Sequence, residues 1–183
     1  ALELHEGLAA YTNGAMRESV RHIVGVQLRN LATVGGSLYS RFGFSDVLTM
    51  FLVLDAQVEL YKGGIVPLSE YAERPKDRDI LVRSIIKKGG RRAAYAAQGR
   101  SGTDFPLIAC CVAKKEGTWY VSVGARPSRA EVVEVAAADG KVDCGAVAEH
   151  FRYGDNTRGS AEYRRHLTEV YAGRLMKQLG GEV

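Results

Sequence analysis

The chain has 183 residues, of which 46% are hydrophobic and 25% are charged, and its net charge at pH 7 is +4. This composition excludes an intrinsically disordered chain and is typical of one or two compact globular domains. The mild positive charge favours an anionic partner. However, the densest basic run, "KKGGRR" at residues 87–92, lies at a glycine turn without aromatic residues, so we expect no nucleic acid partner.

The three cysteines are Cys110, Cys111 and Cys144, and they show no metal-ligand spacing. An odd number of cysteines is also not typical of a secreted disulfide framework, so we expect a reducing, cytoplasmic setting. No apolar run reaches the roughly 18 to 20 residues that cross a membrane, and residues 1–14 lack a secretory signal pattern. We therefore expect no membrane association.

In chain order, residues 4–25 have helical spacing that is interrupted at Gly14 and ends at Gly25. A loop that contains the glycines of "TVGGS", residues 33–37, is predicted next. Ser45 is the predicted N-cap of a buried helix over the apolar run "VLTMFLVLDA", with Asp46 in its first turn.

The middle of the chain is rich in predicted β-structure. Residues 57–68 read as a hairpin around a pair of glycines, and a short helix beginning near Ser69 is stopped by Pro75. Residues 79–88 and 93–98 are predicted strands, and residues 106–125 form a predicted hairpin that turns at residues 115–117. The continuous apolar run through Cys110 and Cys111 predicts a strand that is covered on both faces, with buried thiols.

Two short helices are predicted over residues 129–140 and 144–151. A long final helix is predicted from the N-cap Ser160, with Glu162 in its first turn, to Gly180. Because tight turns join the strands, we expect an α+β fold with a mainly antiparallel sheet and flanking helices. The best candidate for a domain boundary is the glycine pair at residues 89–90.

The glycine pair at residues 35–36 suggests phosphate binding. Backbone amides without a nearby Cβ can approach a pyrophosphate, and the hydroxyl of Thr33 can add a donor. The spacing matches neither a Walker A loop nor the GxGxxG fingerprint, so a plain glycine turn between helices remains an alternative. Asp46 is either an acid that favours the helix dipole or an acceptor for a ribityl or ribose hydroxyl. Asp104 can simply shape the loop that precedes a strand.

No residue is a strong candidate for acid–base or nucleophilic catalysis. Metal-ligand spacing and a GxSxG elbow are both lacking, so we predict no catalytic residue and no metal site in this chain. The four histidines are expected on the surface or in packing roles: His5, His22, His150 and His166.

The segment "VRHIVGVQLRNLATVGGSLYSRFGFSDVLTMFLVLDAQVEL" resembles the second half of the FAD-binding domain in the medium subunit of molybdenum hydroxylases. This group includes xanthine dehydrogenase and carbon monoxide dehydrogenase. Arg29, Asn30 and residues 32–36 stand in the family's motif, and Ser45 and Asp46 follow at the family's distance. Further along, "DILVRSIIKK", "QGRSGTDFPLIACCVA" and "RGSAEYRRHLTEVYAGRL" resemble later segments of the family in the same order.

The resemblance implies a second FAD-binding subdomain of the PCMH type in residues 1–89 and an α+β flavoprotein C-terminal domain in residues 90–183. The resemblance implies that Thr33, Gly35, Gly36 and Ser37 of the "TVGGS" segment approach the pyrophosphate, with Val34 also among the cofactor-binding residues. It implies that Asp46 contacts the ribityl or flavin side of the cofactor. Ile23 and Gly25 would line the cofactor entry, and Leu81 or Leu107 would pack against the isoalloxazine ring. Ser37 departs from the asparagine that is usual in the family.

The resemblance also implies an oxidoreductase subunit that transfers electrons through FAD. In such enzymes a molybdenum-pterin centre in a large subunit hydroxylates the substrate, 2Fe-2S clusters in a small subunit carry the electrons, and FAD passes them to NAD or another acceptor. The family's first FAD subdomain has no counterpart here, so we expect a C-terminal fragment or trimmed subunit with half of an FAD site, inactive alone. The alternatives are a subunit-docking module without cofactor binding of its own and a non-molybdenum FAD oxidoreductase.

Overall fold

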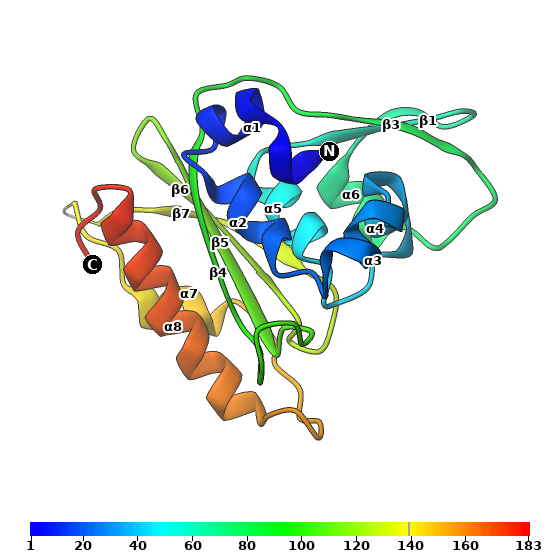
Figure 1. Cartoon of the computed structure of the whole chain (residues 1–183). Coiled ribbons are helices and arrows are strands. Elements are labelled where there is room, and N and C mark those ends of the chain that lie inside the picture. Colours follow the sequence, from blue (N-terminus) through cyan, green and yellow to red (C-terminus); the bar gives the residue numbers. More distant parts are fainter. Residues whose placement is uncertain (139) are drawn as a thin grey trace.

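A computed structural model describes residues 1–138 and 140–183, and it shows a four-stranded sheet with helices on both faces (Figure 1). The helices are η1 (Leu2–Leu4), α1 (Glu6–Tyr11), α2 (Ala15–Arg21), α3 (Val26–Leu31), α4 (Val34–Ser40), α5 (Asp46–Val53), α6 (Leu68–Glu73), α7 (Cys144–Glu149) and α8 (Ala161–Gln178). The strands are β1 (Gln57–Leu60), β2 (Gly64–Pro67), β3 (Leu81–Ile85), β4 (Arg92–Gln98), β5 (Ile108–Lys115), β6 (Thr118–Gly124) and β7 (Glu131–Ala136).

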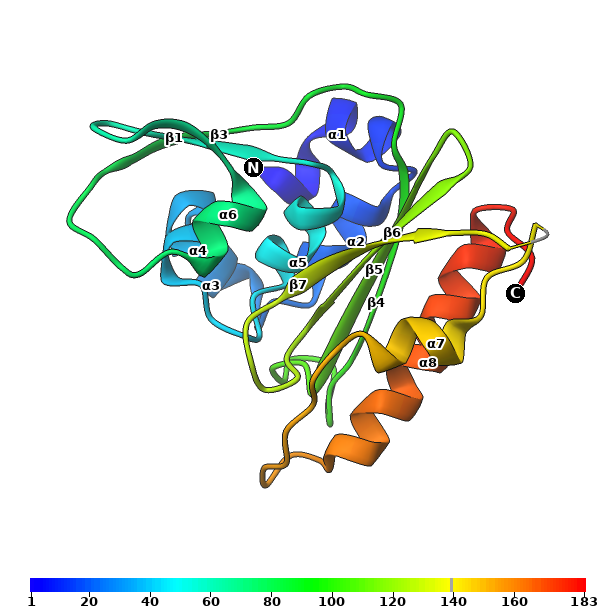
Figure 2. The same cartoon turned by 180° about the vertical axis from the view of Figure 1, so that it is seen from behind.

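The strands form two antiparallel sheets. The smaller sheet has the order β2-β1-β3, and the larger has the order β4-β5-β6-β7. Both predicted hairpins, β1–β2 and β5–β6, are confirmed, as is the antiparallel α+β fold. The view from behind shows α7 and α8 on one face of the larger sheet, with α2 and α5 on the other (Figure 2).

The larger sheet is buried on both faces because adjacent residues of β5 point into different hydrophobic cores. Cys111 packs with the N-terminal helices, and its thiol lies 3.3 Å from the sulfur of Met50. Cys110 packs in the second core, with Trp119 and Met176. The prediction of a strand covered on both faces is therefore confirmed.

The first core joins side chains from both halves of the chain. Met16 and Leu48 pack in the same cluster as Ala93 and Tyr95 of β4. The division of the chain at the glycine pair 89–90 stays a prediction.

The predicted caps of the two principal helices are confirmed. The Ser45 hydroxyl accepts a hydrogen bond of 3.2 Å from the Leu48 amide at the start of α5. The Ser160 hydroxyl accepts one of 3.2 Å from the Tyr163 amide at the start of α8. Gly180, with a φ of +76°, follows the end of α8, where a left-handed residue closes many helices. The shorter α7 is also confirmed within residues 144–151.

The prediction of a helix over residues 129–140 is wrong. Residues 131–136 form β7, which pairs with β6 so that Val133 lies opposite Val121. Valines favour strands, and the free edge of β6 offers the hydrogen bonds that a short isolated helix would have to make internally. Residue 139 of the predicted segment lies outside the described residues.

The prediction of a glycine loop between residues 26 and 44 is also wrong. This segment contains α3 and α4, and both glycines of "TVGGS" lie in the first turn of α4. The cause is Thr33, whose hydroxyl caps the helix by accepting from the Gly36 amide at 2.9 Å. Gly25 starts α3 as its N-cap. Farther along, α6 begins at Leu68, one residue before the expected Ser69.

Within the part of the chain that the structure describes, no helix combines the length and the apolar character needed to cross a membrane.

Candidate functional site

Four of the residues singled out from the sequence meet at the start of α4. Thr33 and Gly36 are joined by the capping hydrogen bond, and a Cβ on Gly35 would lie 4.0 Å from the side chain of Leu81 in β3. The amides of Val34 and Gly35 occupy the first two helical positions, which have no acceptor in their own helix. This end of α4 therefore offers donors to a ligand.

Gly36 is required by the geometry of this cap. A Cβ at this position would lie 2.9 Å from the Thr33 hydroxyl oxygen, a distance that real Cβ atoms do not tolerate. Any side chain would thus displace Thr33 or rotate the first turn of the helix. The absence of a Cβ at Gly36 therefore allows the close approach of the Thr33 hydroxyl that caps the helix.

Ser37 and Ser45 connect α4 to α5. The Ser37 hydroxyl donates to the Thr33 carbonyl at 3.1 Å, and the Ser45 hydroxyl donates to the Ser37 carbonyl at 3.1 Å. Since Ser45 also caps α5, one side chain fixes the first turn of α5 against the middle of α4. Asp46, the first residue of α5, is placed beside Ser37 in this way.

A pocket of about 100 Å³ lies next to this connection. Three predicted site residues line it: Ile23, Ser37 and Asp46. Three phenylalanines that the sequence reasoning missed line it too, namely Phe42, Phe44 and Phe105. Phe42 and Phe44 lie between α4 and α5, whereas Phe105 precedes β5, so no short motif joins them in the sequence.

The carboxyl group of Asp46 is coupled to a buried phenol. The Tyr95 hydroxyl of β4 donates a hydrogen bond to Asp46 Oδ1. Burial raises the pKa of Asp46 from 3.8 to about 6, and the bond from Tyr95 opposes this increase only in part. Burial and the neighbouring Asp46 also raise the pKa of Tyr95 well above its ordinary value. The Asp46 carboxyl group therefore retains its proton at pH values well above the usual titration range of an aspartate.

Asp46 also borders a second, more polar pocket. Glu18 and His22 contribute to one side of it, and Gln98 and Arg100 contribute to another. Asp104 and Pro106 line both pockets. The loop over residues 99–106 thus forms part of the wall of each pocket.

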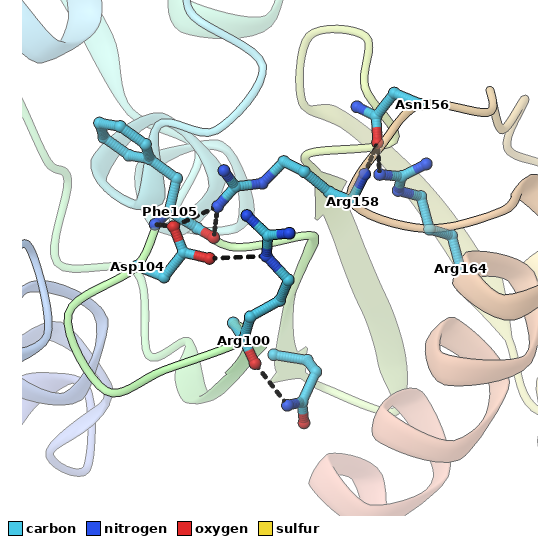
Figure 3. A network of polar contacts seen from close by, with 8 residues as sticks. Arg100, Asp104, Phe105, Asn156, Arg158 and Arg164 are labelled. Atoms are coloured by element: carbon cyan, nitrogen blue, oxygen red, sulfur yellow. Dashed lines mark hydrogen bonds and ion pairs between the residues drawn. The ribbon is translucent and has the colours of Figure 1, made fainter.

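A network of polar contacts holds this loop (Figure 3). Asp104 accepts hydrogen bonds from Arg158, from Arg100 at 3.4 Å and from the Phe105 amide at 2.9 Å. The bond from Arg158 makes the largest contribution to a pKa of Asp104 below its ordinary value. Asn156 in turn accepts from the Arg158 amide at 2.9 Å and from Arg164 at 2.6 Å. Asp104 therefore shapes the loop, as the sequence suggested.

Two further predicted site residues, Val34 and Leu107, also lie outside the pocket that Ile23, Ser37 and Asp46 line. Val34 is half-buried and packs against the first core. Leu107 is only 5% exposed and packs in the second core, on the α8 face of the sheet. Its carbonyl accepts a hydrogen bond of 2.8 Å from Arg164. The structure thus places the Leu107 side chain in the protein interior, while Phe105 two residues earlier is at the pocket.

Residues 2–88 match the model of a known domain family, described as the FAD binding domain in molybdopterin dehydrogenase. The match covers 87 of the chain's 183 residues. The matched segment includes α4, α5, β3 and every candidate site residue except Leu107.

A curated relative matches a larger part of the chain. A protein of Escherichia coli strain K12, named "Uncharacterized protein YgfM", is 28% identical over 166 residues, which cover 88% of this chain. The chain spans 64% of the length of this relative.

Solved structures share the fold over nearly the whole chain. Quinoline 2-oxidoreductase from Pseudomonas putida 86 has a TM-score of 0.76 and 16% identity, with 96% of this chain and 70% of that chain covered. Carbon monoxide dehydrogenase from Oligotropha carboxidovorans has a TM-score of 0.75 and 20% identity, with 93% and 68% covered. The enzyme from Hydrogenophaga pseudoflava, in a form that lacks the Mo-pyranopterin moiety, has a TM-score of 0.74 and 19% identity, with the same coverage.

The residues at the start of α4 fit a part of FAD. The amides of Val34 and Gly35, which have no acceptor within α4, suit a phosphate group. The adjoining pocket of about 100 Å³ is smaller than the roughly 300 Å³ or more of sites that enclose a whole ligand. The geometry therefore suits one side of a dinucleotide cofactor.

Proposed function

We propose that this chain binds FAD as part of the flavin-carrying component of a molybdenum hydroxylase-like oxidoreductase. The observation that carries the proposal is the match of residues 2–88 to the FAD-binding domain family, because the matched segment brings Thr33, Gly35, Gly36 and Leu81 together at one end of α4. The fold shared with three oxidoreductase structures supports it.

In this proposal the start of α4 binds the cofactor's pyrophosphate. The amides of Val34 and Gly35 donate to it. The Thr33 hydroxyl oxygen accepts from the Gly36 amide, and its own proton remains available to donate to the pyrophosphate. Asp46 accepts a hydrogen bond from a ribityl hydroxyl, and Ile23 excludes water from the same pocket. Bound FAD would supply one- and two-electron transfer, while this chain supplies binding and orientation.

The larger assembly belongs to the same proposal. The chain would receive electrons from 2Fe-2S clusters in a small subunit, after oxidation of a substrate at a molybdenum-pterin centre in a large subunit. It would pass them to NAD or another acceptor in the cytoplasm. The similar fold of a carbon monoxide dehydrogenase that is described as a Cu,Mo enzyme supports such partners.

We further propose that residues beyond these 183, on the same polypeptide or on a partner subunit, hold the other side of FAD. The small volume of the pocket supports this view. A ligand held from one side only keeps fewer of its contacts, so the chain alone should bind FAD weakly.

The proposal is tested by titrating the chain with FAD and following the quenching of flavin fluorescence. The same titration is made with a version extended at its N-terminus by the first FAD subdomain of the family. We expect saturable binding by the extended form and much weaker binding by the chain alone. If neither form binds FAD, the flavin assignment is wrong.

A second role, as a subunit-docking module, is favoured by the surface of α3. None of its residues is buried, and its apolar side chains Val26, Leu28 and Leu31 are 58%, 43% and 82% exposed. Exposed apolar groups in one place are typical of a surface that another protein covers. A docking role without FAD binding would be supported if the chain copurified with its partner subunits while the N-terminally extended form bound no flavin.

A further inference from the structure

Six basic side chains gather at one end of the larger sheet. They come from the loop before β4, the first residue of β4 and the last two residues of β5, and Figure 1 shows that these segments lie at the same end of the sheet. Arg92 lies directly opposite Lys114 in the β4–β5 pair, and a Cβ on Gly89 would lie 3.8 Å from Lys115 Nζ. This basic patch consists of Lys87, Lys88, Arg91, Arg92, Lys114 and Lys115.

The basic patch holds more positive charge than the net charge of the whole chain. The chain has 25 basic and 21 acidic residues and a net charge of +4, which the six cations exceed. Like charges directly opposite each other across two strands are destabilising, so the Arg92–Lys114 pair has a cost that a bound anion would relieve. The next acid along the chain is Glu116, which is exposed. Within residues 1–138 and 140–183, four members of the patch form no ion pair: Lys87, Lys88, Arg92 and Lys115.

Contacts with the rest of the fold hold the backbone of the basic patch in place. The Tyr11 hydroxyl of α1 donates to the Lys87 carbonyl at 3.2 Å and accepts from the Gly89 amide at 3.1 Å. Farther along the loop, Arg91 donates to the Val53 carbonyl at 2.7 Å. A partner therefore meets an ordered loop, and binding has to order only the exposed side chains.

The surroundings of the basic patch favour a protein partner over a nucleic acid or a membrane. The Arg91 guanidinium lies 3.6 Å from the centroid of the Tyr120 ring, and the Lys114 ammonium lies 4.6 Å from that of Trp119. These rings also pack against the two cores, so they offer no face for stacking with a base. Residues 87–92 and 114–117 include no large apolar side chain that could insert into a bilayer.

We propose that the basic patch is a docking surface for an acidic segment of a partner protein, a run of Asp and Glu side chains. Lysines carry point charges on flexible stems, which suits an irregular set of carboxylates, and opposite charges steer association and fix orientation. The patch is separate from the proposed cofactor site. β4 runs over seven residues, or about 20 Å, from Arg92 to Gln98, which borders the polar pocket beside Asp46. The proposal therefore does not depend on flavin binding.

Zero-length cross-linking of the natural complex that contains this chain tests the proposal. A carbodiimide joins a lysine amine to an Asp or Glu carboxyl group only where the two groups are in contact, and mass spectrometry identifies the joined residues. We expect cross-links from Lys87, Lys88 and Lys115 to one acidic segment of a partner chain. Lys62, an exposed lysine in the β1–β2 turn, is the control and should form none with that segment. If none of the three lysines is joined to a partner chain, the proposal is overturned.

A pair of double variants provides a second measurement. Lys87→Gln with Lys88→Gln should raise the Kd for the cross-linked partner roughly three- to tenfold at low salt. The difference from wild type should vanish at about 1 M salt, where the Debye length is about 3 Å. Lys62→Gln with Arg78→Gln is the matched control, because it removes two exposed cations outside the patch and should leave the Kd unchanged.

Two results of these measurements would contradict the proposal. One is an equal Kd for the partner in the two double variants. The other is a nucleic acid that copurifies with the wild-type chain but not with Lys87→Gln, Lys88→Gln, which would assign the basic patch to nucleic acid binding. The FAD content of the complex should be the same in both double variants, so it tests the proposed function separately.

Discussion

At the scale of single residues, Asp46 has a property that follows from its burial. Its pKa in the folded chain is about 6, against 3.8 in a solvated carboxyl group, so the folded state binds the proton more tightly than the unfolded state does. The tighter binding of this proton stabilises the folded state fully below about pH 4, and the stabilisation is lost as the pH rises through 6. The carboxylates of Asp79 and Asp104 have lowered pKa values and act in the opposite direction, below pH 4.

Asp46→Asn should therefore remove a decrease in stability between pH 4 and pH 6. At pH 7 the variant should be more stable than the wild type by up to about 3 kcal/mol, because it no longer ionises a buried group. Urea denaturation at pH 4.5 and pH 7 measures the effect. Glu149→Gln, at a side chain that is 67% exposed, is the control and should keep the wild-type pH dependence. A wild-type pH dependence in Asp46→Asn would show that another group is responsible.

The sequence identified part of the site for physical reasons that are local. Ser45 and Asp46 were predictable because an N-cap and an acidic first turn follow from side-chain chemistry within a few residues. The partner of Asp46, Tyr95, comes from a strand 49 residues away, which no local pattern indicates. The same holds for the three phenylalanines at the pocket, because Phe105 meets Phe42 and Phe44 only through tertiary packing.

At the scale of elements, β7 illustrates why one prediction was wrong. The run of residues 131–136 alternates imperfectly, and its alanine and glutamate content is compatible with a helix. The segment forms a strand because it pairs with β6. This pairing cannot be predicted from residues 131–136 alone, since it depends on the position of the preceding β5–β6 hairpin. In contrast, the strongly apolar α5 was predictable because it is buried on almost every side.

The packing of α5 on the larger sheet depends on Gly124, the last residue of β6. A Cβ there would lie 2.5 Å from the buried Thr49 hydroxyl and 3.0 Å from the Gly43 carbonyl. Gly124→Ala should lower the free energy of unfolding by roughly 1 to 3 kcal/mol, measured by urea denaturation. Gly173→Ala, in α8, is the control, since its Cβ would meet only ordinary contacts, at 3.6 Å with Cys144 and at 3.7 Å with Val183. A loss in the control as large as that in Gly124→Ala would contradict this explanation.

At the scale of the whole molecule, the larger sheet joins two cores into one unit. Side chains from residues 1–89 complete the first core on β4 and β5, and α8 completes the second on the opposite face. We therefore expect a single unfolding transition. The fluorescence of Trp119, which lies in the second core and is the chain's one tryptophan, should change at the same urea concentration as the far-UV circular dichroism. Two separate transitions would indicate that residues 1–89 and 90–183 fold independently.

The most direct test of the central claim is the flavin content of the natural complex that contains this chain. The complex is purified with wild-type chain, with Gly36→Val and with the control Gly89→Val, whose Cβ would have no neighbour closer than 3.8 Å. The released cofactor is then identified and quantified by chromatography. We predict about one FAD per chain in the wild type and the control, and a nearly complete loss in Gly36→Val, because its side chain disrupts the Thr33 cap. A complex without FAD, or an unchanged FAD content in Gly36→Val, would contradict the account.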